Sequence, residues 1–198
     1  IGTIENTKAI GICGSGLVDA CASLVQLGLL DNSGRFVTPE QALIAAPKIA
    51  HRLVEREGER VFVLTWGGAE GDLNDCVFLT QRDVRELQFA KAAIATGWAL
   101  LLEEFGVAES EIQQVLLAGS FGSYLSPASA VKIGLVPKLP VMRIVSAGNV
   151  AGEGAKMVLL SAQERNGAMA LLDEIDYIEL SDRADFNDKF VERLSFPA

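Results

Sequence analysis

The sequence has little cysteine and histidine, the side chains that most often bind metal ions or act as catalytic groups. Its three cysteines are Cys13, Cys21 and Cys76, and its single histidine is His51. An odd number of widely spaced cysteines fits neither a disulfide framework nor a metal site. His51 has no cysteine, aspartate or serine partner nearby in the sequence, which favours a surface position. We therefore predict a reduced, cytoplasmic protein with no metal ligands and no catalytic residue in this chain.

Clustered positive charge, long apolar runs and a signal peptide are also absent. Seventeen basic residues face 26 acidic ones, which gives a net charge of −9 over 198 residues. Such a surface does not favour nucleic acids or anionic membranes. No apolar run reaches the ~18 residues of a membrane span, and Ile1–Lys8 lacks the apolar segment of a signal peptide. The chain begins at Ile1 rather than methionine and reads like part of a longer polypeptide.

Apolar residues, in contrast, make up 49% of the chain, enough for one substantial core or two small lobes. The most informative stretch begins with the apolar run Val115–Ala118, which predicts a buried strand. Gly119–Ser123 follows, and then Ser126 and Pro127 predict a helix start. Two interpretations of Gly119–Ser123 stay open here. It is either a tight connection or a loop that holds an anion near a helix N-terminus.

A second copy of this pattern lies about one βα unit further along the chain. Val141–Val145 predicts a strand, Ser146–Ala155 is rich in small residues, and a helix is expected to run on to Ala162. In a parallel sheet, right-handed crossovers bring both loops to the carboxyl edge of the strands. The repeat therefore favours the ligand-site interpretation within an α/β fold.

Other segments predict supporting elements. Alternating residues around Glu57-Gly58 predict a hairpin, and Thr80 with Asp83 predicts the start of the longest helix. On that helix Arg85, Gln88 and Lys91 lie about one turn apart. Such a row is usually solvent-exposed, although it can also face a ligand.

The C-terminal part predicts a strand at Asp176–Leu180 and a helix at Asp185–Leu194 with Phe186, Phe190 and Val191 facing inward. The acidic pair Glu103-Glu104 reads as ordinary helix surface.

Seven segments, in this order, resemble one known family: GICGSGLVDA, TQRDVRELQFAKAAI, VLLAGSFGSYL, ASAVKIGLVP, SAGNVAGEGAKMVLLS, YIELS and FNDKFVERLSFP. They are similar to the C-terminal part of the reductive activators of corrinoid proteins. This family is a branch of the acetate and sugar kinase, Hsp70 and actin superfamily. The resemblance extends from Ile10 to Pro197.

The resemblance implies an α/β fold, namely the second half of an actin-like or Hsp70-like ATPase domain. We expect a ribonuclease H-like mixed sheet flanked by helices. Residues 10–34 and 76–198 would form the main lobe, and residues 35–75 a small insertion that contains the hairpin.

The resemblance also implies a function. In this family an ATPase uses ATP with Mg²⁺, together with a ferredoxin-like iron–sulfur domain, to help reduce Co(II) to Co(I) in a partner corrinoid protein of a methyltransferase system. The iron–sulfur cysteines and the phosphate-binding motifs of the family precede the part that matches here. We therefore expect the missing part to hold Mg²⁺ and the cluster, and we expect no ATP hydrolysis by this chain alone.

The family's nucleotide-binding positions can be carried over one by one. Those of the adenosine motif and the second small-residue loop are Gly119, Ser120, Phe121, Gly122, Gly148 and Asn149. Gln88 and Lys91 fall on a helix that lies against the nucleotide in related ATPases. Gly14, Ser15 and Gly16 would serve the phosphate side or close packing.

Two alternatives remain. The chain could be a binding and homodimerisation module with a degenerate nucleotide site. It could also belong to an activator or kinase from another branch of the superfamily, such as one that serves a radical dehydratase.

Overall fold

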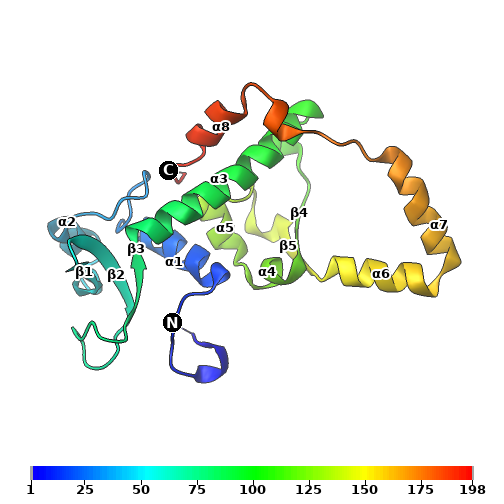
Figure 1. Cartoon of the computed structure of the whole chain (residues 1–198). Coiled ribbons are helices and arrows are strands. Elements are labelled where there is room, and N and C mark those ends of the chain that lie inside the picture. Colours follow the sequence, from blue (N-terminus) through cyan, green and yellow to red (C-terminus); the bar gives the residue numbers. More distant parts are fainter. Residues whose placement is uncertain (1, 198) are drawn as a thin grey trace.

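The structure is a computed structural model that describes residues 2–197. Its helices are α1 (Gly14–Gln26), α2 (Pro39–Ala45), α3 (Gln81–Glu104), α4 (Gly119–Tyr124), α5 (Pro127–Ile133), α6 (Val150–Leu160), α7 (Ala162–Leu171) and α8 (Phe186–Glu192). Its strands are β1 (Leu53–Arg56), β2 (Glu59–Thr65), β3 (Val77–Thr80), β4 (Val115–Ala118) and β5 (Ile144–Gly148). Figure 1 shows a body that contains both termini and an arm, residues 150–179, that contains α6 and α7. The α/β class is confirmed.

The strands of the described residues form two separate sheets. One is antiparallel in the order β1-β2-β3, and the other is the parallel pair β4-β5. The predicted hairpin is confirmed: Glu57 and Gly58 have positive φ angles of 54° and 83°, as a two-residue turn between twisted strands requires. β3 pairs with β2, so this sheet extends past residue 75, where the sequence division placed the end of the insertion.

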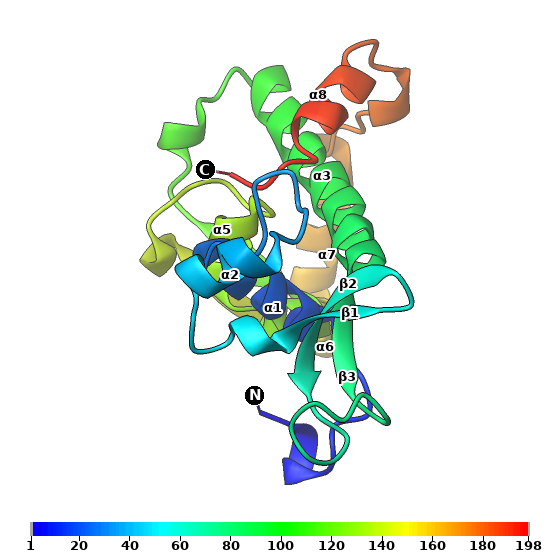
Figure 2. The same cartoon turned by 90° about the vertical axis from the view of Figure 1, so that its left-hand side faces the viewer.

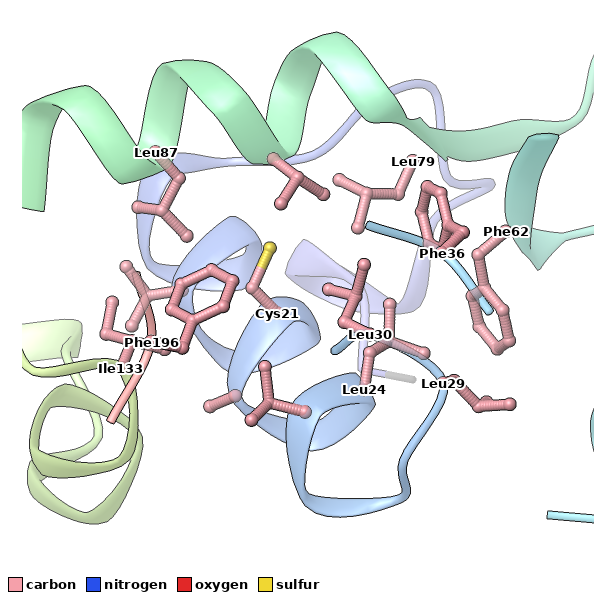
Figure 3. Packing of buried hydrophobic residues seen from close by; sticks show 14 of the residues in the cluster. Cys21, Leu24, Leu29, Leu30, Phe36, Phe62, Leu79, Leu87, Ile133 and Phe196 are labelled. Atoms are coloured by element: carbon pink, nitrogen blue, oxygen red, sulfur yellow. The ribbon is translucent and has the colours of Figure 1, made fainter. Parts of the chain in front are cut away.

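The hydrophobic core is built around α1, which packs against α3 and α5 (Figure 3). Cys21 and Leu24 of this helix are at most 2% exposed. Burying a leucine contributes about 2 kcal/mol, so the apolar face of α1 is a main source of stability. Burial also raises the pKa of Cys21 to about 12, so its thiol stays protonated in the core.

The start of α3 is fixed by a reciprocal cap, as predicted. Thr80 accepts a hydrogen bond from the Asp83 backbone N–H at 3.0 Å, and the Asp83 carboxylate accepts one from the Thr80 backbone N–H at 2.8 Å. Gln88 and Lys91 do not lie on a solvent-exposed face, the usual place for such a row, because both are 2% exposed. The C-terminal segment covers this face of the helix, while Ile94 on another face is 54% exposed.

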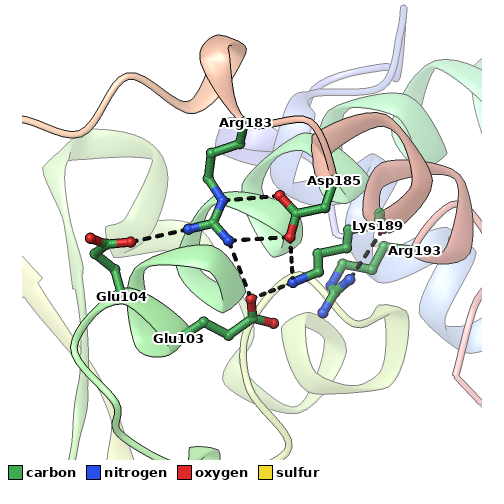
Figure 4. Close-up of polar contacts among 6 residues, drawn as sticks. All are labelled: Glu103, Glu104, Arg183, Asp185, Lys189 and Arg193. Carbon is green, nitrogen blue, oxygen red and sulfur yellow. Dashed lines mark hydrogen bonds and ion pairs between the residues drawn. The ribbon is translucent and has the colours of Figure 1, made fainter.

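α8 lies beside α3 in both views (Figures 1 and 2) and is held there by ion pairs. Figure 4 shows Arg183 between Glu104 at 3.1 Å and Asp185 at 3.0 Å, with Lys189 joining Asp185 to Glu103. The acidic pair at the end of α3 therefore has a structural role that the sequence interpretation missed.

The ring of Phe190 stacks on Phe89 of α3, with centroids 6.0 Å apart, and on Phe186 of α8. The inward position predicted for Val191 is wrong, because this side chain is 63% exposed.

The arm comprises residues 150–179 and stands away from the body in Figure 1. Neither α6 nor α7 has a buried residue. The predicted helix ends at Leu160, and Ser161 caps α7 by accepting a hydrogen bond from Glu164 N–H. The predicted strand at Asp176–Leu180 does not form, and no strand of residues 2–197 pairs with this segment. No helix within residues 2–197 is long and apolar enough to cross a membrane.

Candidate functional site

The candidate site lies at the carboxyl edge of the β4-β5 pair. Parallel pairing aligns Leu117 with Ser146 and Ala118 with Gly148. The segments that follow the two strands therefore start side by side, as the repeated pattern predicted. α4 follows β4 directly and packs against β5, while Asn149 leads from β5 into α6. This register brings Gly119 and Gly148 to one edge.

Gly119–Tyr124 is the six-residue helix α4 rather than a turn. Gly119 has a φ of +86°, which lets the chain bend from the strand into the helix. Ser123 donates a hydrogen bond to the Gly119 carbonyl oxygen at 3.0 Å. The predictions for the next helix are confirmed: Ser126 caps α5 by accepting from Ser129 N–H at 3.3 Å, and Pro127 occupies its first position.

The glycines at this edge fall into two classes. A side chain built at Gly119 or Gly148 would meet no atom within 4 Å, so the backbone there is open to an approaching molecule. Gly122 is different, because its Cβ would lie 2.9 Å from the Leu117 carbonyl carbon. Two of the glycines therefore leave space for a ligand, and Gly122 allows α4 to pack on its own strand.

The N-terminus of α1 meets the same edge through Phe121. A Cβ at Gly14 would lie 2.8 Å from Cε2 of this ring. The Phe121 side chain is still 51% exposed, so one part packs on α1 and the other faces outward. The structure thus brings Gly14 close to Phe121 of α4, and close packing explains why position 14 lacks a side chain.

Cys13 caps α1, a role that the sequence interpretation missed. Its thiol sulfur accepts a hydrogen bond from Gly16 N–H at 3.4 Å and lies 3.5 Å from the Ser15 hydroxyl oxygen. These hydrogen bonds lower the pKa of the exposed Cys13 thiol, and the one with Ser15 has the largest effect. A cysteine directly before a Gly-Ser-Gly run at a helix start was the available signal. Ser15 and Gly16 therefore belong to this cap.

Helix N-termini give the edge its electrostatic character. The residue before α4 is Ala118, whose side chain cannot accept a hydrogen bond, so the first N–H groups of α4 have no side-chain cap. The first turn of α6 is capped by Asn149, whose Oδ1 accepts from Gly152 N–H at 3.1 Å. Uncapped N–H groups and the positive end of a helix favour an anionic or strongly polar ligand.

Gln88 and Lys91 lie away from this edge. Gln88 donates hydrogen bonds to the carbonyl oxygens of Ser33 at 3.2 Å and Leu194 at 2.8 Å. The Lys91 ammonium group donates to the Ser195 carbonyl oxygen at 2.5 Å and lies 5.5 Å from the Phe196 ring centroid. Both side chains therefore bind the C-terminal segment, and their predicted contact with a nucleotide stays a prediction.

The chemistry that this edge offers is binding. Within residues 2–197 no group of three or more histidine, cysteine, aspartate or glutamate side chains could hold a metal ion. His51 is partly exposed and lies 3.4 Å from Glu70, outside the carboxyl edge. The open backbone, uncapped N–H groups and half-exposed Phe121 ring suit a ligand that combines an apolar ring with polar or anionic groups.

Comparisons with known proteins show the family to which the chain belongs. Residues 1–198 match the family described as "C-terminal domain of RACo the ASKHA domain". The corrinoid activation enzyme RamQ of Eubacterium limosum is 39% identical over 189 residues, which are 96% of this chain and 31% of that protein. The [Co(II) methylated amine-specific corrinoid protein] reductase of Methanosarcina barkeri is 22% identical over 191 residues, or 30% of its length. The chain thus spans about a third of the curated relatives that it matches.

A solved structure supports the same assignment. The reductive activator for corrinoid, iron–sulfur protein superposes on 94% of this chain with a TM-score of 0.76 and 33% sequence identity. The match covers 28% of that protein. The family match over residues 1–198 agrees with the recognised segments and with the α/β fold. The chain belongs to the family of C-terminal ASKHA domains of RACo.

Proposed function

We propose that this chain is the nucleotide-binding part of an ATP-dependent reductive activator of a corrinoid protein. Three findings support the proposal: membership of the ASKHA family, two relatives named for corrinoid activation or reduction, and the geometry of the carboxyl edge. The observation that carries the nucleotide site is the pairing of Ala118 with Gly148, because it sets two open glycines side by side.

In this proposal the backbone at the start of α4 binds the polar part of the nucleotide, since its first N–H groups lack a side-chain acceptor. Gly119 and Gly148 let the ligand approach the main chain. Phe121, with half of its surface exposed, offers an apolar face to the base. Ser120, which is exposed, lies at the mouth of the site. ATP supplies binding energy that differs between two conformations of the whole protein.

The nucleotide site can be tested by filling it. We expect Ser120→Trp to weaken the binding of Mg-ADP at least about tenfold, because the indole would occupy the open space at the edge. Isothermal titration calorimetry of the purified protein measures this. Ser110→Trp is the matched control, since Ser110 is exposed and precedes β4 at the opposite edge. Equal affinity in wild type and Ser120→Trp would contradict the assignment.

The redox role that we propose requires parts of the whole protein that lie outside this chain. We propose that an iron–sulfur domain outside this chain supplies the electron that converts Co(II) to Co(I) in a partner corrinoid protein, and that Mg²⁺ and the phosphates are held mainly by a preceding part. This chain alone should then bind nucleotide without hydrolysing it. Phosphate release by the purified chain above the level of a Ser120→Trp variant would contradict it.

A second candidate function is self-association, and the arm favours it. Large apolar side chains of α6 and α7 lie in solvent, among them Leu159 at 77%, Leu160 at 84% and Met169 at 63% exposure. Exposed apolar surface of this kind marks contact sites. We propose a homodimer that uses the arm. Sedimentation velocity should show a dimer that Leu159→Glu with Leu160→Glu converts to a monomer. A dimer that survives both changes would place the contact elsewhere.

A further inference from the structure

A cavity of about 450 Å³ lies outside the candidate nucleotide site. Two of its lining residues, Glu109 and Lys138, belong to the segments that lead into β4 and β5, and so lie on the amino-terminal side of both strands. The remaining walls come from α3, α5 and the C-terminal segment. We call this cavity the amino-edge pocket. Its volume lies within the range of small-molecule sites.

The amino-edge pocket is apolar inside. Trp98 lines it with an indole ring whose N–H already donates to the Leu135 carbonyl oxygen at 3.2 Å. Phe196 lines it as well and is 2% exposed. Gly134 belongs to the wall, and a Cβ there would lie 2.9 Å from Pro197 Cγ, so the C-terminal segment fits closely against α5. The pocket therefore offers the half-buried Trp98 side chain to an apolar body, while Phe196 is packed into its wall.

Positive charge gathers around this apolar interior. The pocket is lined by four cations and two carboxylates: Lys91, Lys132, Lys138, Arg193, Glu109 and Glu192. The local excess is two positive charges, in a chain whose net charge is −9. No ion pair within residues 2–197 involves any of the four cations. One carboxylate, that of Glu109, accepts instead from the Lys138 backbone N–H at 2.6 Å.

Two of these cations lie close enough to repel each other. The pKa of Lys91 is lowered to about 8, first by burial and then by the charge of Arg193. Gathering like charges beside an apolar wall is unfavourable unless an opposite charge binds between them. An anion in the pocket would relieve this repulsion.

We propose that the amino-edge pocket binds an organic anion in which a phosphate or carboxylate group is joined to an apolar, ring-sized body. The anionic group lies among Lys132, Lys138 and Arg193, and the body packs against Trp98. This site is separate from the nucleotide site and does not depend on it, because no residue of Gly119–Gly122 or Gly148–Asn149 lines the pocket.

The indole N–H of Trp98 gives a direct test. In two-dimensional NMR spectra of the isotope-labelled chain, Trp66→Phe leaves one indole signal, since the sequence has two tryptophans. Phenyl phosphate, phenylacetate and benzyl alcohol serve as probes with a phosphate, a carboxylate and no charge. We expect a saturable shift of the Trp98 signal with at least one of the two anions, at an affinity about tenfold higher than for benzyl alcohol.

Charge variants complete the test. Lys132→Gln should weaken binding of the preferred anion about fivefold or more, because it removes a charged partner. Lys48→Gln, a change at an exposed lysine outside the pocket, should leave the affinity unchanged. A Trp98 signal that neither anion moves, equal affinity for benzyl alcohol, or an unchanged affinity in Lys132→Gln would each overturn the proposal. Shifts confined to Gly119–Gly122 would overturn it as well, and would assign the anion to the carboxyl edge.

Discussion

Lys91 carries its ammonium group in the interior of the body, where one carbonyl oxygen and one aromatic ring surround it. Its sequence neighbourhood, a row of polar residues one helical turn apart, was typical of a solvent-exposed face. What buries the row is the C-terminal segment, more than 100 residues further along the chain. Local spacing carries no information about such a distant cover, so this part of the fold could not be predicted from α3 alone.

The buried charge of Lys91 leads to a pH dependence. Its pKa is about 8 in the folded chain, against an ordinary value of 10.5. Between these values the unfolded state binds more protons, so the free energy of unfolding should rise with pH, by at most about 3 kcal/mol. Urea unfolding of wild type and Lys91→Met from pH 7 to 10.5 measures the difference. The raised pKa of Cys21 acts in the opposite direction above pH 9, but equally in both proteins. If the free energy of unfolding changed equally with pH in both proteins, the lowered pKa of Lys91 would be contradicted.

Two helical glycines, Gly122 of α4 and Gly154 of α6, predict opposite effects of one substitution. Gly122→Ala should destabilise the chain by about 1–3 kcal/mol, because its Cβ would lie 2.9 Å from backbone atoms of Leu117. Gly154→Ala in α6 should stabilise the arm by about 1 kcal/mol, because nothing lies within 4 Å of the added methyl group. Circular dichroism during thermal unfolding measures both. Tolerance of Gly122→Ala would show that α4 does not pack on β4 as described.

At the scale of elements, the sequence predicted the features that depend on neighbouring residues, such as helix caps. The caps at Thr80 and Ser126 were recognisable, since a cap depends on residues within one turn. The segment Asp176–Leu180 had a strand-like sequence but no strand beside it, because pairing depends on neighbours in space. The helical form of Gly119–Tyr124 was missed for a related reason: packing of α4 against β5 outweighs the weak helix preference of its two glycines.

The cap of α3 gives a prediction at this scale. Thr80→Ala should lower the free energy of unfolding by about 1 kcal/mol, because it removes the acceptor of the Asp83 backbone N–H. Thr80→Ser keeps a hydroxyl group and should recover most of this loss. Chemical denaturation of the three proteins compares them. Equal stability of Thr80→Ala and wild type would mean that the Asp83 carboxylate alone caps the helix.

At the scale of the molecule, the structure separates a well-packed body from an arm with no buried residue in either helix. The sequence predicted the strand–loop–helix repeat, and the structure confirms that both loops start at one sheet edge. It did not predict α7, the amino-edge pocket, or the ion pairs of α8. The pocket and the ion pairs depend on contacts between distant segments, whereas α7 begins at a local cap, Ser161 with Glu164, that the sequence interpretation overlooked.

The separation of body and arm predicts a contrast in hydrogen exchange. Amides of α6 and α7 should exchange much faster than those of α1, because no buried side chain protects the arm from local unfolding. Mass spectrometry at several protein concentrations measures this contrast. Slow exchange in the arm at the lowest concentration, where self-association is weakest, would contradict the description of the arm as unsupported by the body.

The central claim is that a nucleotide binds at the carboxyl edge of β4 and β5, and a titration of the isotope-labelled chain with Mg-ADP tests it most directly. Two-dimensional NMR spectra report each backbone amide separately. We expect saturable shifts at Gly119–Gly122, Gly148 and Asn149, while the Trp98 indole signal in the amino-edge pocket stays in place. Saturable shifts that spare both loops and occur elsewhere, for instance around Gln88 and Lys91, would contradict the claim.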